Sequence, residues 1–128
     1  MLRKSAVIAF VLMIATPISV QAQDGQMPLN TFLETASRLE ARGPLALLSS
    51  DFSRLQREVE QGAASYKRQL ERQRAAGETP HSCPPRGGVE LSSDALLTHF
   101  RSIPANRRAR MSVRDAFGDM MRTRYPCR

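Results

Sequence analysis

The stretch SSDFSRLQREVEQGAASYKRQLERQRAAG, residues 49–77, decides the fold because it predicts one long amphipathic helix. Ser49, Ser50 and Asp51 are typical of a helix N-terminus, and Gly77 is typical of a helix end, so we expect the helix to run to about Ala76. Its apolar or small residues recur every three or four positions, which places them on one face; they are Phe52, Leu55, Val59, Gly62 or Ala63, Tyr66 and Leu70. The charged residues between them indicate a solvated face.

Before this helix, the sequence predicts a shorter one that begins near Asn30, a good capping residue, and ends at Gly43-Pro44. Its apolar face consists of Leu29, Phe32, Leu33, Ala36 and Leu39. Residues 23–27 are expected to be a polar, mobile start. Leu45 to Leu48 form a short apolar turn between the two helices.

After the long helix, residues 78–88 form a loop with three prolines and two glycines. Ser92-Ser93 caps a third helix, which buries Leu96, Leu97, Phe100 and Ile103 and stops at Pro104. An arginine-rich turn, 105–111, leads to Ser112 and Asp115, which resemble a capping box. The last helix buries Val113, Ala116, Phe117, Met120, Met121 and Tyr125 and ends at Pro126. With no strand pattern, we expect one all-α domain of about four helices over residues 23–128.

The first 22 residues have the pattern of a cleaved signal peptide. Arg3 and Lys4 supply the positive start, residues 6–16 the apolar stretch, and Val20-Gln21-Ala22 the small-residue cleavage site, which leaves Gln23 first. A membrane anchor is the alternative, but the apolar run is shorter than the roughly 20 residues that span a bilayer. The sequence therefore predicts export to the periplasm and no stable membrane insertion after cleavage.

Export bears on the two cysteines, Cys83 and Cys127, because an oxidising compartment lets such a pair form a disulfide. In the chain-entropy model, closing a loop of this size stabilises a small domain by about 4 kcal/mol. We expect a Cys83–Cys127 bridge, with intermolecular pairing and free thiols as the alternatives.

The charge is basic and uneven. The chain holds 19 Lys and Arg against 12 Asp and Glu, and residues 96–128 hold eight Arg and only two Asp. This third of the chain is the expected contact surface for an acidic partner, and Arg107, Arg108 and Arg110 are the candidate binding residues. The alternative is that the arginines reflect the codons of a G/C-rich genome and have no binding role. Nucleic acid is a poor candidate, since no aromatic residue for base stacking lies among the arginines of 105–111.

Catalytic and metal sites have little support in the sequence. No G-x-S-x-G, H-E-x-x-H or phosphate-binding glycine loop is present. His81, His99, Cys83 and Cys127 fit no common zinc spacing, although His81 and Cys83 with Met111, Met120 or Met121 could hold a soft metal if the thiols stayed reduced. We expect no enzyme activity, no metal and no cofactor.

The C-terminal half resembles the Rap/Tai family of periplasmic immunity proteins, which are associated with type VI secretion. The matching segments are Cys83-Pro84-Pro85, the helix 95–100, the break at Ile103-Pro104, and Ala116-Phe117 leading to Tyr125-Pro126-Cys127. The resemblance implies a small helical domain, often dimeric, that binds a toxic effector from a neighbouring cell. It also implies that Cys83 and Cys127 are the family's disulfide pair.

These observations predict a non-enzymatic periplasmic protein that binds and neutralises a secreted effector protein. The alternative is an envelope structural or chaperone-like helical protein, which contacts acidic polymers or clients through its basic surface. The first predicts one tight partner, and the second predicts many weak, salt-sensitive ones.

Overall fold

The computed structural model describes residues 25–128, and the predicted signal peptide 1–22 lies outside that range. The described chain is all-α, as predicted. Its elements are α1 (Leu29–Arg42), the 3-10 helix η1 (Gly43–Leu48), α2 (Ser50–Ala75), α3 (Ser93–Ser102), α4 (Ala105–Arg108) and α5 (Val113–Arg124). Within residues 25–128 no helix is both long and apolar enough to span a membrane.

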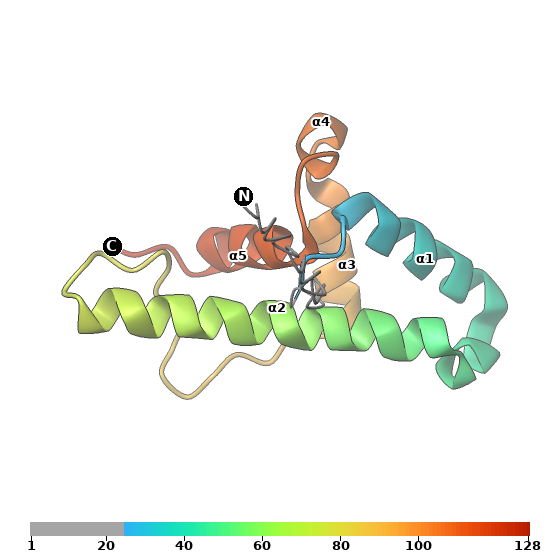
Figure 1. The fold of residues 1–128 in the computed structure, drawn as a ribbon, viewed down its shortest axis with the longest axis horizontal. Helices are drawn as coiled ribbons and strands as arrows, with labels where there is room; N and C mark the ends of the chain where they lie inside the picture. Colours follow the sequence, from blue (N-terminus) through green and yellow to red (C-terminus); the bar gives the residue numbers. More distant parts are fainter. Residues whose placement is uncertain (1–24) are drawn as a thin grey trace, which may run out of the picture.

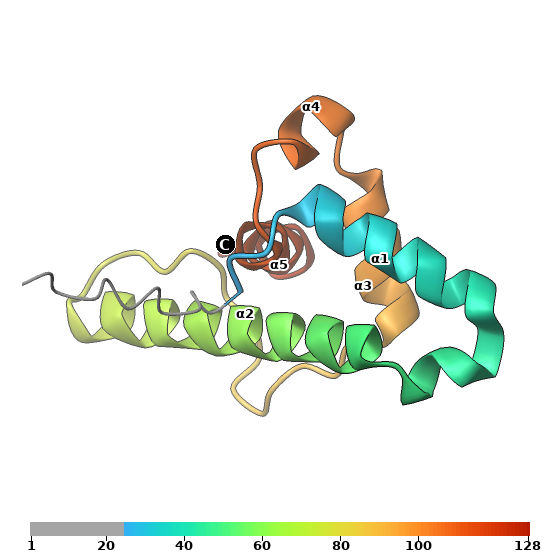
Figure 2. The same ribbon diagram turned by 45° about the vertical axis from the view of Figure 1, so that its right-hand side comes forward.

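The long helix α2 is the base on which the other elements pack. It lies along the bottom of Figure 1, with α5 beside its C-terminal half and α1 folding back from its N-terminal end. Figure 2 shows α1 and α3 together on the same side of α2, with α4 above them. The most extensive packing joins α2 to α5.

Local sequence explains most helix boundaries. The Ser49 hydroxyl accepts a hydrogen bond from the Phe52 amide, and Ser92 does the same for Ala95, so both predicted caps are confirmed. Ser112 and Asp115 form the predicted capping box at the start of α5. Gly43 ends α1 with φ of 64°, a conformation that glycine adopts without strain.

The start of α1 differs from the prediction. The helix begins at Leu29, Pro28 is its cap, and Asn30 lies inside it, because the preceding segment is held by a distant part of the chain. The Leu29 amide donates to the Met111 carbonyl, and the Val113 amide donates to the Met27 carbonyl, each at 2.9 Å. Gly25 and Met27 are buried, so the expected mobile start is wrong for residues 25–27.

Small residues let the segment 25–27 lie against the point where α2 and α5 cross. A Cβ atom on Gly25 would come within 2.9 Å of the Gly62 Cα, and one on Gly62 would lie 3.5 Å from the Arg114 Cα. The predicted apolar face of α2 is confirmed, with Leu55, Gly62, Tyr66 and Leu70 buried; Phe52, Val59 and Ala63 are partly buried against the core. Gly62 is therefore the contact point of α2 with the start of α5.

The core lies where α1, α3 and α5 meet α2. Its centre includes Leu29, Phe100, Val113 and Met120, all fully buried. Phe32 and Phe100 make an edge-to-face contact at 5.7 Å between ring centroids, which joins α1 to α3. Fully burying one side chain of this size stabilises the fold by about 1.5–3 kcal/mol.

The Cys83–Cys127 disulfide is present, with the two Cα atoms 5.0 Å apart, as predicted. It ties the loop after α2 to the C-terminus, and the Cys83 amide also donates to the Tyr125 carbonyl at 2.8 Å. Figure 1 shows this loop and the C-terminus side by side at the C-terminal end of α2. The bridge thus fixes the loop that leads into α3.

Candidate functional site

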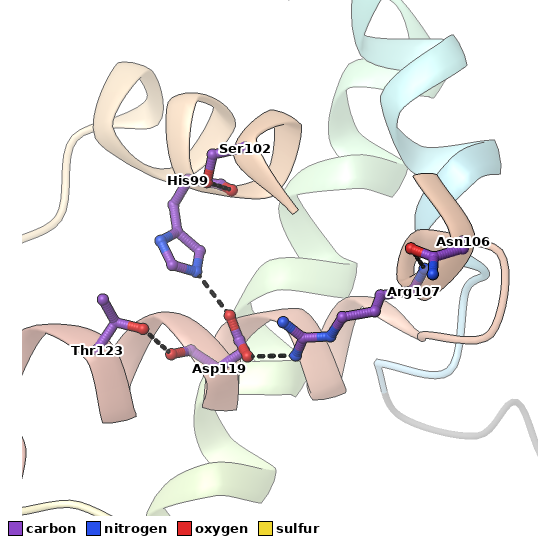
Figure 3. Close-up of polar contacts among 6 residues, drawn as sticks. All are labelled: His99, Ser102, Asn106, Arg107, Asp119 and Thr123. Carbon is purple, nitrogen blue, oxygen red and sulfur yellow. Dashed lines mark hydrogen bonds and ion pairs between the residues drawn. The ribbon is translucent and has the colours of Figure 1, made fainter. Parts of the chain in front are cut away.

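Of the three arginines predicted to bind a partner, Arg107 has an internal role. Residues 105–108 form α4, where the sequence predicted only a turn, and α4 points the Arg107 guanidinium toward α5. Its Nη2 donates to Asp119 Oδ1 at 2.7 Å, while His99 Nε2 lies 3.1 Å from Asp119 Oδ2. Figure 3 shows the two side chains meeting the carboxylate from opposite sides, so Asp119 joins α3, α4 and α5.

The charge of Asp119 is stabilised by these neighbours. Partial burial raises the pKa of its carboxyl, but hydrogen bonds and charge attraction from Arg107 and His99 outweigh burial and hold the pKa below its ordinary value of 3.8. Asp119 is therefore ionised at neutral pH, and it offsets part of the charge that Arg107 would present to a partner.

Arg108 and Arg110 differ from Arg107 and from each other. The Arg108 side chain is partly buried, its Nη1 lies 3.5 Å from the Arg101 carbonyl oxygen, and its Nε has no hydrogen-bond partner within residues 25–128. Arg110 is exposed and makes no ion pair within the same range. The three residues are close in sequence, but they have three different environments.

Arg108 lines a groove that the sequence analysis did not predict. The groove has a volume of about 520 Å³ and lies between α1 and the α3–α4 region. One face of α1 supplies Asn30, Leu33, Glu34, Ser37 and Arg38; Arg101 of α3 and Arg108 of α4 complete the lining. We call it the arginine groove. The i, i+3, i+4 spacing of its α1 residues is visible in the sequence, but their arginine neighbours come from more than 60 positions away.

A second feature is an apolar corner on η1, which we call the leucine corner and whose exposure the sequence did not predict. Leu45, Leu47 and Leu48 are 73%, 62% and 86% exposed, whereas Ala46 between them is buried. The sequence predicted this apolar turn but gave no sign that only the alanine would face the core. Three neighbouring exposed leucines are unlike the scattered single apolar residues of an ordinary surface.

A polar cavity of about 410 Å³ lies between α2 and α5, next to the loop after α2. The Tyr66 hydroxyl hydrogen-bonds the Ser82 hydroxyl, and His81 Nδ1 lies 3.5 Å from the same Ser82 oxygen. Burial raises the pKa of Tyr66 and lowers the pKa of His81, which nearby Arg122 lowers further. Ser82 is fully buried, so its hydroxyl stabilises the loop and is not accessible to a substrate.

The residues considered for a soft-metal site are not free to form one. Both sulfurs are in the disulfide, and Met120 and Met121 are buried in the core. His81 faces Tyr66 and Gly118, while His99 faces Asp119. Over residues 25–128, no three His, Cys, Asp or Glu side chains lie close enough together to hold a metal ion.

No protein-family model, curated protein or solved structure matches this chain. The resemblance to the Rap/Tai immunity proteins therefore stays a prediction.

Proposed function

We propose that this chain is a non-enzymatic, periplasmic protein-binding domain that neutralises a secreted toxic effector by covering its active site. The observation that carries the proposal is the leucine corner. Within residues 25–128 the other leucines are buried or partly buried, whereas Leu45, Leu47 and Leu48 are exposed to solvent on one turn. Contiguous exposed apolar side chains are characteristic of surfaces that contact another protein.

The local structure holds this corner in a defined position. Gly43 and Pro44 begin η1, and the Ser49 hydroxyl donates to the Ala46 carbonyl at 2.8 Å, which fastens its end to the start of α2. Because α1 and α2 hold η1 from both sides, little conformational freedom is lost when a partner binds. Burying each leucine in an interface is worth roughly 1.5–3 kcal/mol before the costs of association.

The basic charge supports the same proposal in a different way. Arginines such as Arg110 and Arg124 are exposed and make no ion pair within residues 25–128, so an acidic effector would be attracted before contact. Electrostatic attraction of this kind raises the association rate, while the apolar corner slows dissociation. The two features together suit one tight protein partner.

A contact competition tests the proposal. A strain that lacks this gene is grown against its parent, with and without the gene restored, while secretion by the parent is monitored. We expect the deletion strain to lose only when the cells touch, and restoration to cure the loss. Equal survival of the deletion strain and its parent, while the parent's secretion system is active, would refute the immunity function.

The alternative, an envelope structural or chaperone-like protein, is favoured by the exposed arginines of residues 96–128. It predicts weak binding to several acidic polymers or clients, lost at physiological salt, where charges more than about 8 Å apart are screened. The effector hypothesis predicts one stoichiometric complex that survives this salt.

Sedimentation of the purified protein over a concentration series tests the homodimer that the family resemblance implies.

A further inference from the structure

Besides the leucine corner, the arginine groove is a second surface whose side chains indicate the chemistry of a ligand. Arg38 comes from α1, Arg101 from α3 and Arg108 from α4, so three separate helices each contribute an arginine to one lining. Figure 2 shows α1, α3 and α4 adjacent on one side of α2. Leu33 adds an apolar part to the lining, and Asn30 and Ser37 add neutral hydrogen-bonding groups.

Internal contacts use only part of the hydrogen-bonding capacity of these arginines. Each guanidinium has five N–H donors. Arg38 Nη2 donates to the neutral Thr35 hydroxyl at 3.0 Å, and Arg108 reaches only the Arg101 carbonyl oxygen, at 3.5 Å. Arg101 alone has a carboxylate partner within residues 25–128, Glu40 at 2.6 Å, and both side chains of that pair are about half exposed.

We propose that the arginine groove binds an acidic segment of the partner protein, with its carboxylates on Arg38 and Arg108. Guanidinium groups bind carboxylates with paired hydrogen bonds, which gives direction as well as charge. An apolar residue of the same segment would lie on Leu33. The proposal rests on the proposed function, because it names the chemistry of the partner that the leucine corner also contacts.

The position of the groove favours a protein over a membrane. Its α1 residues, 30–38, occupy the first two-thirds of the 14-residue helix α1, and the leucine corner follows the end of that helix. One protein of ordinary interface size, about 800 Å² on each side, covers both. Leu33, Asn30 and Ser37 in the same lining suit the mixed side chains of a protein segment better than a layer of lipid phosphates.

Glu34 allows a test in which a substitution should strengthen peptide binding instead of weakening it. It is the one carboxylate among the groove-lining residues, and it repels an incoming acidic segment. Glu34→Gln removes that repulsion without shortening the side chain. The variant should therefore bind an acidic peptide more tightly, a result that general loss of structure cannot produce.

The test measures binding of a fluorescein-labelled peptide of alternating glutamate and leucine to the full, exported and oxidised protein, by fluorescence anisotropy in about 150 mM salt. We expect Arg38→Glu with Arg108→Glu to weaken binding at least tenfold, and Glu34→Gln to strengthen it two- to threefold. Arg68→Glu with Arg86→Glu is the matched control, because it changes the net charge equally at exposed positions outside the groove. Circular dichroism checks that each variant is folded.

Unchanged binding in the Arg38 and Arg108 variant would overturn the proposal, as would an equal loss in the control. Binding of anionic phospholipid vesicles without binding of the peptide would also overturn it, in favour of a membrane contact. The contact competition is independent of this result. Protection that survives the Arg38 and Arg108 changes would refute the groove and leave the proposed function standing, whereas peptide binding without protection would do the reverse.

Discussion

The Asp119 side chain joins α5 to both α3 and α4. It accepts from Arg107 and pairs with His99, and its backbone carbonyl accepts from the Thr123 hydroxyl at 2.9 Å. The Arg107 charge, which the sequence assigned to a partner, is thus engaged with α5. No local pattern predicts this, since Arg107 and Asp119 lie 12 positions apart on different helices.

We predict that Asp119→Asn lowers the free energy of unfolding by about 1 kcal/mol near neutral pH. The substitution removes the negative charge from the contacts of Asp119 with Arg107 and His99, and the effect is small because these contacts are partly exposed to solvent. The pKa of Asp119 is lowered in the folded protein, so its contribution is present above the ordinary value of 3.8 and is lost as pH falls through the folded-state value. Urea unfolding across this pH range should show the variant and wild type converging in acid. Glu71→Gln, at an exposed position of α2, should show no such difference; a pH-independent gap for Asp119→Asn would contradict the assignment.

The buried Tyr66–Ser82 hydrogen bond allows a second prediction. Tyr66→Phe leaves the fully buried Ser82 hydroxyl without its main partner, and we expect this to cost about 1–3 kcal/mol. Adding Ser82→Ala removes the unsatisfied group, so the double variant should recover part of that loss. A thermodynamic cycle from urea titrations measures the coupling; additive losses would show that the two hydroxyls do not interact.

At the scale of elements, the α2–α5 crossing depends on the size of residue 62. A Cβ on Gly62 would make an ordinary contact, 3.5 Å from the Arg114 Cα, and alanine also favours the helix. We predict that Gly62→Ala is neutral or stabilises by up to about 1 kcal/mol, whereas Gly62→Leu destabilises by about 1–3 kcal/mol through overpacking. Denaturant midpoints measure both. Equal effects of the two changes would show that the helices are not in close contact there.

The elements that the sequence predicted well are those with local causes. The Ser49 cap, the apolar face of α2 and the Ser112–Asp115 capping box all involve residues within a few turns of one another. The start of α1 was predicted to within a residue or two, but its cap was missed, because the segment before it is held by Met111 and Val113, more than 80 positions away. The α4 helix was missed because it has only four residues, too few to show helical periodicity.

The candidate surfaces were less predictable than the helices. The leucine corner is contiguous in sequence, but its exposure depends on how α1 meets α2, which turns only Ala46 inward. The arginine groove requires the packing of α1 against α3 and α4 and has no contiguous signature. Composition predicted a basic surface near the C-terminus, yet it could not separate Arg107, paired with Asp119, from the groove residue Arg108.

At the scale of the whole molecule, the disulfide and the leucine corner lie at opposite ends of α2. Cys83 and Cys127 close the fold at the C-terminal end of that helix, and η1 leads into its N-terminal end (Figure 1). The disulfide stabilises this small domain at one end. The leucine corner and the arginine groove lie on or beside α1 and are the surfaces proposed to bind a partner. This separation lets the residues proposed to bind a partner change without removing the disulfide that constrains the fold.

The measurement that tests the central claim most directly is contact competition with a leucine-corner variant. Leu45→Ser, Leu47→Ser and Leu48→Ser together change only exposed side chains, so we expect a folded, exported protein that no longer protects the deletion strain. The control is Lys67→Ser, Arg68→Ser and Glu71→Ser on the exposed face of α2, which should protect as well as wild type. Full protection by the leucine variant, at matched protein levels, would contradict the account.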